Sequence, residues 1–229
     1  INFDSDVVDL TITGIFDPAE LPAAFGNLAV DIFPSFRAEV PISRNEVFEF
    51  SVNYRSSQTI LGFLIPGLHI AANTSAYGQF NSVDGVFNAF LRSDKIAYDN
   101  VVVNDFTLDL GKVSEVAKGK MYASHAQVGK LTFENPGLEL EAYNDMVDME
   151  VGWLNENGTT SGDLRASLDL LSKERMILQI EPGRLGLSGV NWSIDSLAVI
   201  AKDTTHYSIS NFHMSGDRQY VHAEGMIGE

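Results

Sequence analysis

Histidine and acidic side chains are the groups in this sequence best suited to catalysis or metal binding. The five histidines are scattered, and no His-Glu-x-x-His pair occurs. His206 and His213 lie seven residues apart on an expected strand, which would put their side chains on opposite faces. The sequence has no Gly-x-Ser-x-Gly elbow, phosphate-binding glycine loop or dinucleotide-binding motif. It therefore predicts no catalytic, cofactor or metal site, and we do not expect an enzyme.

Two acidic clusters offer carboxylates that could bind calcium. Asp4 and Asp6 flank a serine, and Asp145, Asp148 and Glu150 lie close together in the chain. Neither cluster has the spaced oxygen ligands of a calcium-binding loop. Because acidic residues are common in turns and on the wet face of strands, we interpret both clusters as solvated surface.

Composition restricts the partners and the cellular setting. The net charge of −16 and the pI of about 4.5 argue against nucleic acid, because the fifteen Lys and Arg residues form no basic cluster. No cysteine occurs, and no apolar run of about eighteen residues predicts a transmembrane segment. The chain starts at Ile1 among polar residues and stops after a strand-like run. We therefore expect residues 1–229 to be one continuous β-rich segment from inside a longer protein.

Apolar residues recur at every second position through most of the chain. The pattern is clearest in Leu138–Glu141, Val147–Trp153 and Leu164–Leu170, where Glu, Asp, Arg and Ser fill the alternate positions. The polar breaks between these runs are too short for a crossover helix. The sequence thus predicts a mainly β protein, a long antiparallel meander with one apolar and one polar face.

Helical signals interrupt the alternation near the N-terminus. Asp17 and Pro18 resemble a helix start, and apolar residues follow at helical spacing up to Pro34, so we predict an amphipathic helix over residues 18–33 inserted between strands. Residues 36–42 and 48–54 alternate again and predict a hairpin. A second, short helix is expected over residues 56–64, ahead of Pro66 and Gly67.

A short pattern recurs four times with irregular spacing. Residues 104–110, 134–140, 181–187 and 210–214 each pair a polar, turn-like start with a two-residue apolar alternation. We interpret these segments as β-hairpin units added along one axis. The alternative is a closed β-sandwich, which could hold as many strands in a chain of this length.

The amino-acid sequences of several segments resemble those of a known protein family. The similarity lies in residues 96–110, 131–140 and 185–194, in the helix predicted at 18–33, and in the segment Leu64-Ile65-Pro66-Gly67-Leu68. These segments are similar to the β-rich region of TamB-like and AsmA-like translocation and assembly module proteins of the Gram-negative envelope, in particular the Bacteroidetes-type TamB-like protein. The resemblance covers most of the chain, although no single motif is diagnostic.

The resemblance implies an elongated, apolar-lined trough, a β-taco, within a periplasmic bridge whose parent protein is anchored in the inner membrane. It implies phospholipid acyl chains as cargo, support of outer-membrane biogenesis, and an outer-membrane assembly partner contacted through the parent protein. The alternating residues that would line the groove are Phe106, Leu108, Leu110, Leu138, Leu140, Val147, Met149, Val151, Leu164, Leu168, Leu170, Leu185 and Leu187.

A rival hypothesis is a secreted or cell-surface β-sandwich that binds glycan or protein. In that case the same apolar residues would form an ordinary core. Aromatic residues near turns, Tyr143, Trp153 and Trp192, would then be candidates for stacking on sugar rings.

Overall fold

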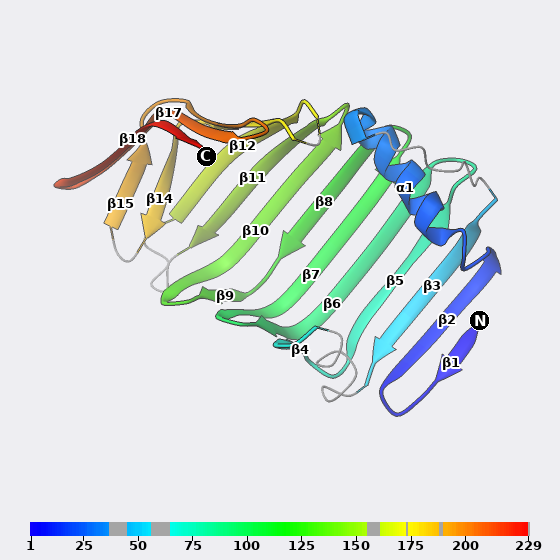
Figure 1. Ribbon diagram of the computed structural model, residues 1–229. Helices are drawn as coiled ribbons and strands as arrows, with labels where there is room; N and C mark the ends of the chain where they lie inside the picture. The colour runs from blue at the N-terminus through cyan, green and yellow to red at the C-terminus, as the bar shows by residue number, and fades with distance from the viewer. Residues whose placement is uncertain (37–44, 56–64, 155–160, 173, 188–189, 229) are drawn as a thin grey trace.

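A single antiparallel sheet forms almost the whole molecule. The structure is a computed structural model that describes residues 1–36, 45–55, 65–154, 161–172, 174–187 and 190–228. Within these residues, eighteen strands join one sheet, and one α-helix, α1 (Leu21–Ile32), lies against it (Figure 1). The prediction of a mainly β, antiparallel meander is confirmed. The helix expected at 56–64 lies outside the described residues, as does nearly all of the strand expected at 36–42.

The strands follow one another across the sheet in chain order, from β1 at one edge to β18 at the other (Figure 1). They are β1 (Asn2–Asp4), β2 (Val8–Ile15), β3 (Val47–Tyr54), β4 (Leu68–Ile70), β5 (Thr74–Asn81), β6 (Val86–Tyr98), β7 (Val101–Val113), β8 (Val116–Tyr122), β9 (His125–Val128), β10 (Leu131–Tyr143), β11 (Met146–Leu154), β12 (Ser161–Leu170), β13 (Met176–Ile180), β14 (Gly183–Leu187), β15 (Val190–Ile194), β16 (Ala198–Lys202), β17 (His206–Gly216) and β18 (Gln219–Gly228). Some positions in the sheet hold two short strands end to end, such as β8 and β9, which both pair with β7 and β10.

The strand register lines up apolar side chains in rows across the sheet. Cross-strand partners point to the same face, so a chain of partners defines a row. The central row, with one residue from each of nine strands, is Leu10, Val52, Ala76, Leu91, Leu108, Met121, Leu138, Val151 and Leu164. The second row is Ile12, Phe50, Gly78, Ala89, Leu110, Gly119, Leu140, Met149, Ala166, Ile180 and Ala198.

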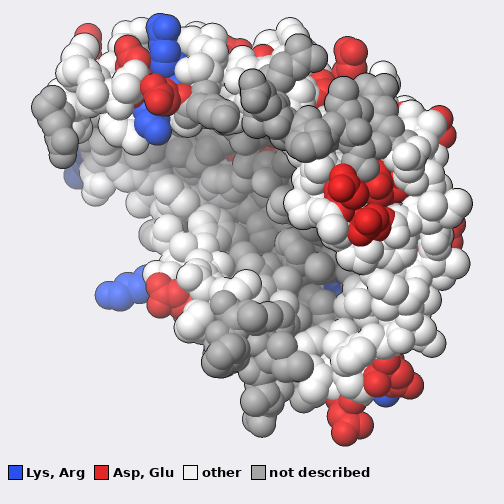
Figure 2. All heavy atoms as spheres, turned by 45° about the vertical axis from the view of Figure 1, so that its right-hand side comes forward, with Lys and Arg blue, Asp and Glu red and all other residues white. Residues whose placement is uncertain are grey.

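The opposite face carries charged ladders at the alternate positions. Lys118 Nζ lies 3.0 Å from Glu141 Oε2, and Lys120 Nζ lies 3.0 Å from Glu139 Oε2 on the neighbouring strand. Figure 2 shows a molecule hollowed on one side, with most of the visible charged side chains on the outer surface and the rims. We therefore call the face of the two apolar rows the inner face and the charged face the outer face.

A line of irregular residues crosses the sheet, and we call it the crease. Asp105 in β7, Asn135 in β10 and Asn211 in β17 have positive φ angles of 50°, 48° and 56°. The register of the adjacent strand shifts by one residue beside Asn135 and beside Asn211, as at a β-bulge. Hydrogen bonding continues through the crease, since the Asn135 N–H donates to the Ser124 carbonyl at 2.9 Å.

The crease corrects the interpretation of the four recurring segments. Their polar residues Asp105, Asn135 and Asn211 lie inside strands, and Pro182 separates β13 from β14, which both pair with β12. They are therefore bulges and breaks within strand positions, not hairpin turns. Sequence alone reads them as turns because Asn and Asp favour the left-handed conformation in both settings.

Helix α1 packs on the inner face near one end of the strands (Figure 1). Its buried residues Ala24 and Leu28 contact Phe48 and Phe80 of the sheet, and the Phe25 ring lies 4.7 Å from that of Phe80. This burial confirms that the apolar stripe of the helix is covered by the sheet. The helix begins three residues later than predicted, because Asp17 instead holds a preceding turn by accepting the Ala19 N–H at 2.9 Å.

Candidate functional site: the apolar inner face

The residues predicted to line a groove lie on one face of the sheet. Leu108, Leu138, Val151 and Leu164 belong to the central row, and Leu110, Leu140 and Met149 belong to the second row. The next position along the strands places Val147 beside Leu168, and Leu168 beside Leu178. Phe106 and Leu170 extend the same alternation by two residues along β7 and β12.

Leu185 and Leu187 belong to a more buried part of this inner face. Leu185 forms a cluster with Trp153 and Ile194, and Leu187 packs against its margin. Val151 and Leu164 of the central row contact the same cluster, which makes it continuous with the rows. All thirteen predicted residues therefore share the inner face.

Sequence reasoning missed part of this lining. Leu10, Val52 and Leu91 extend the central row toward the N-terminal edge, and Ile180 and Ala198 extend the second row toward the C-terminal edge. Their alternation was visible in the sequence. What the sequence could not supply was the register that joins these strands to the central ones.

The second row includes small residues among the large ones. Gly119 lies between Leu110 and Leu140, and a Cβ atom built on it would meet a carbon of either leucine at 3.0 Å. Gly78 is covered by the Phe50 ring in the same way, with an added Cβ meeting two ring carbons at 2.8 Å. The leucine and phenylalanine side chains thus lie flat over the glycines and form a smooth apolar surface.

In the described part of the chain, most of the inner face is only partly buried. Of the thirteen predicted residues, only Leu185, at 7% exposure, counts among the buried hydrophobic residues. The accessible surface of 14074 Å² is about 1.4 times the roughly 10,300 Å² expected for a compact monomer of 25.1 kDa. All eighteen strands of the described residues belong to one sheet, so no second sheet of theirs covers the rows.

The aromatic residues proposed for sugar stacking are partly or fully buried. Trp153 is 9% exposed, and its indole N–H donates to the Gly186 carbonyl at 3.1 Å. Trp192 packs against the same inner-face cluster. Tyr143 is bonded through its hydroxyl to Asp148 at 3.0 Å, which raises the pKa of the tyrosine. Of the three rings, Trp153 is the one that is buried, and Tyr143 and Trp192 are half-buried.

The carboxylates with perturbed pKa values lie outside the apolar rows. A hydrogen bond from the Tyr122 hydroxyl, followed by one from Lys120, lowers the pKa of Glu139 on the outer face. Asp195 accepts a hydrogen bond from Ser215 at 2.9 Å, and this bond is the largest cause of the lowered pKa of Asp195.

The polar group around Asp195 includes a histidine but lacks the geometry of a catalytic triad. His213 Nδ1 lies 2.9 Å from Asp195 Oδ2, and the Ser215 hydroxyl donates to the same oxygen. In a triad the serine would bond to the imidazole instead. His206 and His213 both lie on the outer face, contrary to expectation, because the register shift between Ile209 and Phe212 separates them.

No group of three His, Asp or Glu side chains among the described residues is placed to hold a metal ion. No helix in the described part of the chain has the length and hydrophobicity to cross a bilayer.

Comparisons with protein-family models, with curated proteins and with solved structures find no match to this chain. Relationships to known proteins therefore add nothing to the geometry, and the chemistry of the inner face carries the functional argument.

Proposed function

We propose that this chain is a periplasmic segment of a TamB-like or AsmA-like bridge, which holds phospholipid acyl chains on its inner face and conducts them along the sheet. In this proposal the parent protein is anchored in the inner membrane, supports outer-membrane biogenesis, and reaches an outer-membrane assembly partner through regions outside this segment. The observation that carries the proposal is the continuity of the apolar rows.

The length of the rows fits an extended apolar ligand. Neighbouring strands lie about 4.8 Å apart, so the eleven strands of the second row span roughly 48 Å. Burial of one methylene contributes about 0.8 kcal/mol, so several methylenes on this surface are enough for retention without any charged contact.

Uniform lining favours movement as well as retention. A chain that shifts by one strand spacing exchanges contacts with Leu108 for contacts with Met121, and then with Leu138. These side chains are similar in size and apolarity, so the free energy of binding changes little at each step. Such a surface holds lipid without trapping it at one position.

Lipid extraction of the purified protein tests this function. We expect phospholipid to co-purify and labelled fatty acid to bind, as measured by native mass spectrometry and fluorescence. Leu140→Asp or Leu168→Asp on the inner face should reduce capture, whereas the adjacent outer-face changes Glu141→Ala and Asp169→Ala should leave it unchanged. Circular dichroism of each variant separates loss of binding from loss of folding.

Two outcomes would contradict the function. One is a protein that purifies free of lipid and takes up no labelled fatty acid. The other is capture that falls equally in the inner-face and outer-face variants, which would place the lipid outside the apolar rows.

A further inference from the structure

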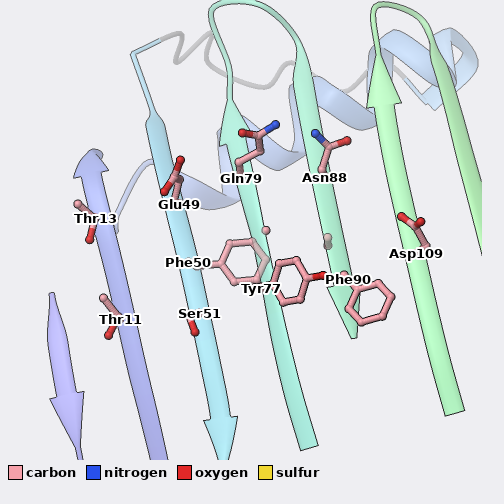
Figure 3. Close-up of a pocket in the computed structure, with 12 residues that line it drawn as sticks. Thr11, Thr13, Glu49, Phe50, Ser51, Tyr77, Gln79, Asn88, Phe90 and Asp109 are labelled. Atoms are coloured by element: carbon pink, nitrogen blue, oxygen red, sulfur yellow. The ribbon is translucent and has the colours of Figure 1, made fainter. Parts of the chain in front are cut away.

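The outer face contains a hollow that the acyl-chain function does not use. It has a volume of about 600 Å³ and lies over β2, β3, β5, β6 and β7 (Figure 3). Two outer-face rows supply most of its lining. One row is Thr13, Glu49, Gln79 and Asn88, and the other is Thr11, Ser51, Tyr77, Phe90 and Asp109.

An aromatic pair lies within this polar hollow. Tyr77 and Phe90 are cross-strand partners whose ring centroids are 5.2 Å apart, with ring planes inclined by 33°. Tyr77 is 56% exposed, although its neighbours in the same outer-face row, Ser51 and Thr11, are polar. The rings therefore offer an apolar platform among hydrogen-bonding groups.

Hydrogen-bonding side chains surround the aromatic platform. Figure 3 shows Gln79 and Asn88 opposite each other, farther along β5 and β6 than the two rings, with Glu49 and Asp109 on the strands to either side. Glu49, Gln79 and Asp109 are exposed and Asn88 is half-buried, so their amide and carboxylate groups are accessible to a ligand. Amides both donate and accept, and carboxylates accept from hydroxyl groups.

We propose that this hollow binds a neutral oligosaccharide chain lying across the strands. Sugar rings present C–H faces that stack on aromatic rings, and their hydroxyl groups bond to amides and carboxylates. Glu49 and Asp109 lie three strand spacings apart, roughly 14 Å, so the site has room for consecutive sugar rings over the platform.

The same groups disfavour other ligand classes. Two carboxylates repel phosphate and other anions. An apolar ligand would leave the amides of Gln79 and Asn88 desolvated without partners. A basic peptide could form ion pairs with Glu49 and Asp109. The side chains between these two carboxylates are neutral, however, and would give the other charged groups of such a peptide no partner.

Titration of the purified chain with cellohexaose, chitohexaose and maltohexaose tests the site. We expect at least one hexasaccharide to bind, with NMR shift changes confined to outer-face residues of β3, β5, β6 and β7. Tyr77→Ala and Phe90→Ala should weaken binding at least about tenfold, and Gln79→Ala should weaken it with the aromatic pair intact. Tyr122→Ala, which removes an exposed tyrosine elsewhere on the outer face, should leave affinity unchanged.

Several results would overturn the proposal. They are an absence of binding by all three sugars, or binding that survives Tyr77→Ala in a folded protein. Preferential binding of hexalysine that is abolished by salt and by the double change Glu49→Gln and Asp109→Asn would assign the hollow to a basic partner instead. Lipid capture should be unchanged in Tyr77→Ala, so failure of this site leaves the inner-face function standing.

Discussion

Lys112 of β7 and Asp31 of helix α1 form an ion pair that joins the helix to the inner face, with Lys112 Nζ 3.1 Å from Asp31 Oδ2. The lysine side chain is 3% exposed, whereas the aspartate is 50% exposed. The same ammonium donates to the carbonyls of Gly85 and Ser114. Lys112 is thus a buried cation with three acceptors.

This asymmetry predicts unequal effects of removing the two partners. Lys112→Met should lower the free energy of unfolding by about 2–3 kcal/mol, because it removes three hydrogen bonds donated by a buried ammonium group. Asp31→Asn should cost less than about 1 kcal/mol, because the aspartate is half exposed and the lysine keeps its carbonyl partners. Urea denaturation measures both values, with the exposed Lys118→Met as control. Equal effects of the two changes would contradict this account of the ion pair.

The crease provides a test of backbone conformation. Asn135 has a φ of 48°, which glycine adopts without strain and a β-branched residue does not. Asn135→Gly should therefore leave the free energy of unfolding nearly unchanged, and Asn135→Val should lower it by about 1–2 kcal/mol. Leu131→Val, at a regular and exposed position of the same strand, controls for the introduction of a β-branched side chain. Tolerance of valine at position 135 would mean that the bulge is not required.

The lowered pKa of Glu139, on the outer face, predicts that the free energy of unfolding depends on pH. The Tyr122 hydroxyl is the main cause that lowers the pKa of Glu139, and Lys120 adds to it. Because the folded-state pKa is below the unfolded value, the stabilisation is present above the unfolded pKa and is lost as pH falls through the folded pKa. Tyr122→Phe should raise the pKa of Glu139 toward its ordinary value, and Lys120→Met should raise it less. Carboxyl NMR titration measures both shifts, and a larger effect of the lysine change would reverse the assigned order of causes.

Alternation in the sequence was sufficient to predict the strands and the shared face of the lining residues. Leu138, Leu140 and Val151 could be placed correctly because two-residue periodicity has one structural solution over several residues. The acyl-chain function of that face stays a prediction.

The remaining features depend on long-range pairing that the sequence does not specify. The sequence predicts turns at Asn135 and Asn211, because the neighbouring strand decides between a turn and a bulge and the sequence does not specify that strand. The outer-face hollow was not predicted because Tyr77 and Phe90 lie in mid-strand positions and become neighbours only through the β5–β6 register. The rival hypothesis required an exposed Trp153, and its burial could not be foreseen because its partner Gly186 lies on β14, 33 residues further along the chain.

Photocrosslinking can test whether the lining is continuous, which the proposed function requires. Benzoylphenylalanine would replace Val52, Leu108 or Leu164, three members of the central row on β3, β7 and β12. If acyl chains move along the whole row, irradiation with bound phospholipid should give a lipid adduct at each of the three positions. Mass spectrometry of the intact protein detects the adducts.

The adjacent outer-face positions supply matched controls for each probe. Ser51, Asp109 and Arg165 lie one residue along the same strands, and their side chains point away from the inner face. They should give no adduct. Adducts confined to position 164, near the Trp153 cluster, would instead indicate a local binding pocket, because a continuous surface gives lipid no reason to avoid Val52 and Leu108.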